Sequence, residues 1–144
     1  MKIFLLFVIA ILFILRVKGT PRMLSKKRYL KAIKESLDNI ESQYKDYSEE
    51  RTKTAKMGSL LIGLIVQIII AIVYMVIGAR INITYFTILT LIQLLTVVYT
   101  SVSQLNMNVF DPVIENHKFH RWYFLFNVIL DYIYYPLAFY LLIK

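Results

Sequence analysis

Four polar side chains interrupt the apolar segments of this sequence: Gln67, Gln93, Asn127 and Asp131. Carboxyl and amide groups in such surroundings can share hydrogen bonds, hold a cation or relay a proton. If their segments are helices, with a rise of about 1.5 Å per residue, Gln67, Gln93 and Asp131 each lie about 14–18 Å from the same predicted face of the membrane. We therefore expect the four residues to form one hydrogen-bonded cluster near the middle of a membrane.

Asp131 is the residue of this cluster with the most consequential chemistry. An ionised carboxylate at the bilayer centre costs about 2.5–3.5 kcal/mol on insertion scales. The apolar segments contain no Lys or Arg, so no basic partner within the chain is expected. Three interpretations stay open: a protonated carboxyl that joins the helices through Gln67 or Gln93, a group that faces a protein partner, or an ion or proton site.

The elements that carry these residues are long apolar segments. Hydrophobic residues make up 58% of the chain and charged residues 18%, against about 45–50% and 25% in soluble domains. Residues 57–79, 85–105 and 122–143 reach the length of about 20 residues that a spanning helix needs, whereas 3–15 is shorter. The sequence predicts an all-α integral membrane protein with four transmembrane helices, the first one short, and excludes a compact soluble enzyme.

Basic residues predict how these helices are oriented. Of the 17 Lys and Arg residues, 12 fall within 16–56, and such segments stay in the cytoplasm. We predict an N-terminal anchor over 1–18, a cytoplasmic helix over 19–56, and a three-helix bundle over 57–144 with a cytoplasmic loop at 106–121. Both termini are then predicted to lie outside the cell, and the membrane is predicted to be a bacterial plasma membrane. A cleaved signal peptide or an interfacial helix is the alternative for residues 1–18.

Residues 19–56 carry a regular apolar seam. Its members follow one another at alternating intervals of three and four residues, as in a coiled coil: Leu30, Ile33, Leu37, Ile40, Tyr44 and Tyr47. No Pro or Gly interrupts 23–57, which predicts one long amphipathic helix. The seam can pack on the protein itself, dock a protein partner or a second copy, or lie on the membrane surface.

The start of this segment is basic, and no acid precedes Glu35. Each base near anionic lipid headgroups contributes about 1 kcal/mol of attraction. The residues expected to make such contacts are Arg16, Lys18, Arg22, Lys26, Lys27 and Arg28. Nucleic acid is not an expected partner, because the segment is tethered at both ends and its second half is acidic.

The chain lacks catalytic sequence motifs. It has no glycine-rich phosphate loop, no GxSxG, no HExxH and no cysteine. We therefore predict neither an enzyme nor a cofactor or metal site. The leading hypothesis is a non-catalytic membrane accessory or assembly subunit that docks protein partners through the seam and the polar cluster. The alternatives are an ion, proton or solute transport or holin-like pore component, and a membrane immunity protein against a toxin or bacteriocin.

Overall fold

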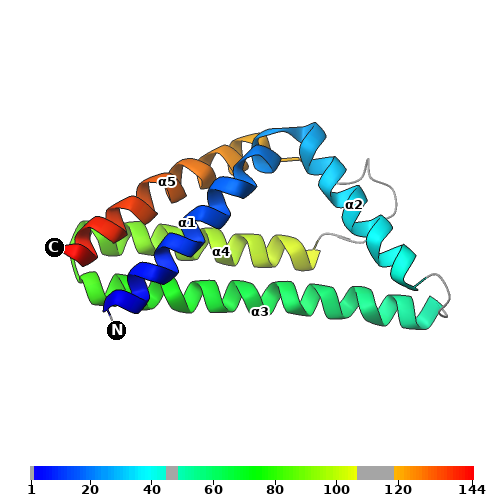
Figure 1. The fold of residues 1–144 in the computed structure, drawn as a ribbon, viewed down its shortest axis with the longest axis horizontal. Helices are drawn as coiled ribbons and strands as arrows, with labels where there is room; N and C mark the ends of the chain where they lie inside the picture. The colour runs from blue at the N-terminus through cyan, green and yellow to red at the C-terminus, as the bar shows by residue number, and fades with distance from the viewer. Residues whose placement is uncertain (1, 45–48, 107–118) are drawn as a thin grey trace.

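The computed structural model describes residues 2–44, 49–106 and 119–144, and these ranges contain helices and no strand. The helices are α1 (Lys2–Leu24), α2 (Lys26–Tyr44), α3 (Glu49–Ile81), α4 (Thr84–Asn106) and α5 (Arg121–Ile143) (Figure 1). Four segments are long and apolar enough to cross a membrane: Lys2–Leu24, Thr54–Ile81, Thr84–Ser103 and Arg121–Ile143. The predicted all-helical class and the four long apolar helices are thus confirmed.

The first helix is longer than the apolar run that predicted it. That run ends at residue 15, but α1 continues to Leu24 and includes Arg16 and Pro21. Arg16 does not end the helix, and its side chain contacts Asp131 of α5. With 23 residues, α1 is as long as α4 and α5.

The range 23–57, predicted as one helix, is divided in the structure among the end of α1, all of α2 and the start of α3. Ser25 separates α1 from α2, and its carbonyl accepts the first bond of α2 from the Tyr29 amide at 2.9 Å. Residues 45–48, which lie outside the described ranges, stand between α2 and α3. In Figure 1, α2 leads from the end of α1 to the start of α3, so the chain changes direction where a straight helix was predicted.

The four apolar helices pack as two pairs. The most extensive contacts join α1 to α5 and α3 to α4, and the contacts between the pairs are fewer (Figure 1). Lys2 at the start of α1 donates a 3.0 Å hydrogen bond to the carbonyl of Ile143 at the end of α5, so this pair is antiparallel. The other pair is joined by Asn82 and Ile83; Asn82 has a φ of 47°, a conformation that Asn tolerates better than most residues.

The buried core lies at one end of the molecule, where the two pairs meet. It contains two residues of α1, two of α3, one of α4 and four of α5: Leu5, Ile9, Tyr74, Ile77, Phe86, Tyr134, Tyr135, Ala138 and Leu142. The rings of Phe86 and Tyr134 stack at its centre with centroids 5.0 Å apart. Toward the other end the two pairs diverge in Figure 1, so the core closes only one end of the bundle.

Close contact between α3 and α4 depends on Gly78. A Cβ atom at this position would lie 2.9 Å from Cγ2 and 3.1 Å from Oγ1 of Thr90. We expect Gly78→Ala to lower the free energy of unfolding by about 1–3 kcal/mol, the usual cost of overpacking. The loss should shrink in Gly78→Ala/Thr90→Ala, which removes both contacts, and should be absent in Gly58→Ala, where nothing lies within 4 Å. Equal unfolding curves for Gly78→Ala and wild type in detergent would contradict this.

Candidate functional site

A buried ion pair links α1 to α5. The Arg16 guanidinium contacts Oδ2 of Asp131, and Gln93 of α4 donates a 2.8 Å hydrogen bond to Oδ1 of the same carboxylate. Asp131 is 1% exposed, whereas the Arg16 side chain is 26% exposed. The expectation that Asp131 has no basic partner within the chain was wrong, because Arg16 lies inside α1 and reaches the carboxylate from there.

Matching depths could have revealed this pair. Arg16 is 14 residues from Lys2, and Asp131 is 12 residues from Ile143, which Lys2 contacts. At 1.5 Å per residue, both charges lie about 18–21 Å from the same end of the bundle. The short apolar run hides this signal in the sequence, because a charge that follows such a run ordinarily marks the end of a span.

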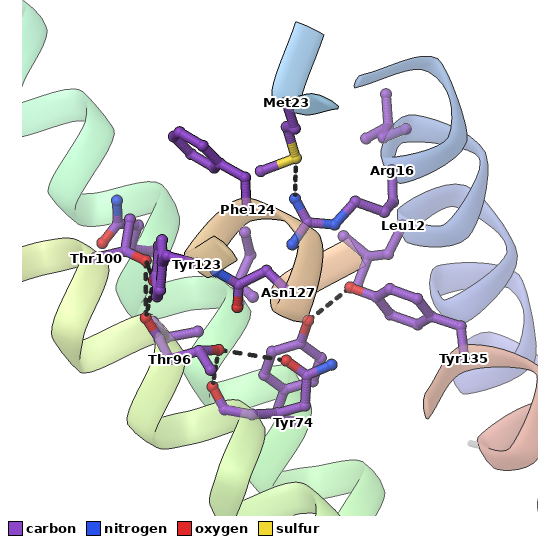
Figure 2. A pocket seen from close by; sticks show the side chains of 15 residues that line it. Leu12, Arg16, Met23, Tyr74, Thr96, Thr100, Tyr123, Phe124, Asn127 and Tyr135 are labelled. Carbon is purple, nitrogen blue, oxygen red and sulfur yellow. Dashed lines mark hydrogen bonds between the residues drawn. The ribbon is translucent and has the colours of Figure 1, made fainter. Parts of the chain in front are cut away.

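A cavity of about 330 Å³ lies beside the ion pair, between all four apolar helices (Figure 2). It is open rather than sealed, and its lining mixes apolar side chains with hydrogen-bonding groups. The polar members come from α1, α3, α4 and α5: Arg16, Gln67, Tyr74, Gln93, Thr96, Thr100, Tyr123, Asn127 and Tyr135. Donors and acceptors from four helices therefore converge on one space.

Most of the polar lining is held in place by hydrogen bonds. The hydroxyls of Thr100 and Tyr123 are 2.6 Å apart, and the Tyr123 hydroxyl also donates to the carbonyl of Thr96 at 3.2 Å. Ser101 donates to Oε1 of Gln67, which joins α4 to α3. These bonds fix the orientation of the groups that line the cavity.

Tyrosines separate the cavity from the closed end of the bundle. The hydroxyls of Tyr74 and Tyr135 are 2.6 Å apart, and both side chains line the cavity (Figure 2). The rings of Tyr74 and Tyr134 meet edge to face at 5.1 Å, which continues the packing into the core. These tyrosines are not predictable as site residues from the sequence, because a tyrosine in an apolar segment carries no distinguishing spacing.

The four predicted polar residues gather around this cavity. Gln93 and Asp131 are directly bonded, and Gln67, Gln93 and Asn127 line the cavity. Asn127 is 5% exposed and, among the residues that the structure describes, its side chain has no hydrogen-bond partner. The structure thus places the four at one level, but links Gln67 to Ser101 instead of to the carboxylate.

The predicted seam of α2 faces α3. Leu37 is buried, and Leu30, Ile33 and Ile40 are half-buried. A second cavity of about 360 Å³ lies between this seam and the first turns of the apolar part of α3. Tyr44 ends α2, and Tyr47 lies outside the described residues.

The predicted headgroup-binding residues fall into two groups. Five have exposed side chains at the end of α1 and the start of α2: Lys18, Arg22, Lys26, Lys27 and Arg28. Arg16 differs from them, since its guanidinium is directed to Asp131 and to the sulfur of Met23 at 3.0 Å.

The arrangement as a whole is suited to hold a polar group inside the bundle. No protein-family model, curated protein or solved structure matches this chain.

Proposed function

We propose that this protein is a non-catalytic integral membrane accessory or assembly subunit that docks a protein partner. The observation that carries the proposal is the open cavity between the α1/α5 and α3/α4 pairs. Its lining combines apolar side chains with hydrogen-bonding groups from four helices. A space of about 330 Å³ with such a lining can receive a group of a partner protein.

The proposed membrane arrangement follows from the charged residues. The exposed bases at the end of α1 and the start of α2 suit the anionic headgroups of a cytoplasmic leaflet. Lys2 and Ile143 lie at the opposite end of the bundle, where they are joined by a hydrogen bond. In this orientation the core lies on the outer side, and α2 lies on the cytoplasmic side.

We propose that α2 supplies a second docking surface. Its seam residues Ile33, Leu37 and Ile40 share the α2–α3 cavity with Ser59, Leu60 and Gly63. The contact with α3 therefore covers the seam only in part, and a partner helix or a second copy of the chain can complete it.

Native co-purification tests the proposal. The tagged full chain, extracted from its native membranes in mild detergent, is expected to elute with a second protein or as a defined oligomer when analysed by mass spectrometry. Replacing three apolar residues of the seam, in Ile33→Ser/Leu37→Ser/Ile40→Ser, should lower the amount of recovered partner several-fold. The exposed-face control Lys34→Ser/Asp38→Ser should not change recovery. A chain that purifies alone and monomeric would contradict the proposal.

A pore or transport component is the second candidate, favoured by the lining of the cavity from all four apolar helices. The buried core closes one end, so transport would need that end to open. Reconstituted vesicles that stay tight to small ions across the pH range would argue against this candidate. Flux that depends on the protein would favour it.

A further inference from the structure

We infer that the cavity between the four apolar helices binds an uncharged hydrogen-bonding side chain, an amide or a hydroxyl, carried by an otherwise apolar membrane segment of a partner. This inference rests on the proposed docking function and names the chemistry of the group that is docked.

Asn127 is an amide without a partner. It is 95% buried in the bundle and lines the cavity, yet no side-chain hydrogen bond reaches it from the part of the chain that the structure describes. The amide atoms keep access to the open cavity, since within the described residues only Oδ2 of Asp131 is a sealed side-chain polar atom without a hydrogen bond. The two donors and one acceptor of Asn127 face the same space as the guanidinium of Arg16 (Figure 2). A ligand with both donor and acceptor atoms satisfies Asn127 best.

The charges at the cavity balance, which selects against an ion. Arg16 is neutralised by Asp131, and no other charged side chain lines the cavity within the described residues. A carboxylate or ammonium that entered would leave an uncompensated charge in low-dielectric surroundings, which is strongly unfavourable. Arg16 nevertheless retains donor capacity, because one of its nitrogens contacts only the weakly accepting sulfur of Met23. An uncharged acceptor can use it.

The rest of the lining is apolar. Leu12, Leu15, Ile70, Val97 and Phe124 share the cavity with the polar groups. A free, fully polar solute would leave these side chains against polar atoms. A single amide or hydroxyl on an apolar segment matches both parts of the lining, and hydrogen bonds of this kind hold helices together in lipid.

A defined peptide tests the inference. The full chain is reconstituted in phosphatidylcholine vesicles with a labelled host helix of Leu and Ala, carrying either Gln or Leu at its midpoint. Energy transfer to the protein measures association. We expect the Gln host to associate about tenfold more tightly than the Leu host, as expected for an interhelical hydrogen bond in lipid. The preference should disappear in Asn127→Leu and persist in Asn127→Gln.

The matched control is Phe126→Leu, an equivalent exchange on the neighbouring exposed position, which should keep the preference. If Asn127→Leu does not fold, Val97→Phe, which fills the same cavity, has to remove the preference. Equal binding of both hosts to the wild type, or a preference that survives both substitutions, would overturn the inference.

A small uncharged solute is the other source of the same chemistry. Glycerol and urea flux into the same vesicles is expected to equal that of protein-free vesicles. Protein-dependent flux that is lost in Asn127→Leu would assign the cavity to a solute and overturn the inference. If the peptide test fails but a partner still co-purifies from native membranes, only the inference about the cavity is wrong. If the chain purifies without a partner and as a monomer, the proposed function is wrong.

Discussion

Replacing Arg16 with Gln is expected to lower the free energy of unfolding by about 3–5 kcal/mol, the cost of breaking a buried ion pair by removing one partner. The carboxylate of Asp131 is 1% exposed, so it depends on the guanidinium for its counter-charge. Gln93 still donates to Oδ1, but one amide hydrogen bond cannot offset an unpaired charge. Titration of the detergent-solubilised protein with a denaturing detergent, followed by the fluorescence of Trp122, measures the change.

The two partners should not be equivalent. Asp131→Asn leaves Arg16 unpaired, but its side chain is 26% exposed and borders the open cavity, where water can solvate it. We expect this variant to lose less stability than Arg16→Gln. The double variant Arg16→Gln/Asp131→Asn should recover most of the loss, since no charge remains buried. Additive losses in the double-mutant cycle would show that the two side chains do not interact.

Replacing Phe86 with Ala is expected to cost about 3–5 kcal/mol, because the substitution leaves a cavity in a packed core. Phe86 is fully buried where the two helix pairs meet and stacks on Tyr134. The loss should appear in the same titration as a lower midpoint with an unchanged slope.

The adjacent Tyr85 provides the control for this substitution. It is 55% exposed on the outside of α4, so Tyr85→Ala removes an aromatic ring without opening the core. We expect a change within about 0.5 kcal/mol, as for surface positions in general. Comparable losses for the two variants would mean that the core at this end does not hold the helix pairs together.

Hydropathy predicted the helices because length and apolarity are local properties of the sequence. The segments 57–79, 85–105 and 122–143 fall within α3, α4 and α5. The separation of α1 from α2 at Ser25 was not predicted, since no Pro or Gly lies within residues 23–57 to mark it.

Part of the candidate site could likewise be predicted from the sequence, because polar residues in apolar segments are a local feature. Gln67, Gln93, Asn127 and Asp131 are polar residues in apolar surroundings, a local signal, and the structure places them at one level. Arg16 was assigned to lipid headgroups because a charge beside a short apolar run usually marks the end of a span. Its pairing with Asp131 is a tertiary contact between residues 115 positions apart, which only the packing of α1 on α5 reveals.

Photocrosslinking in native membranes tests most directly whether the cavity is a docking site. Val97 lines the cavity, and its neighbour Val98 is exposed on the outside of α4, so a photoreactive side chain at each position samples two environments with one chemistry. We predict that position 97 forms a discrete adduct with one partner protein, the same protein that co-purifies in mild detergent, and that position 98 does not. Adducts with lipid alone at both positions would contradict the account.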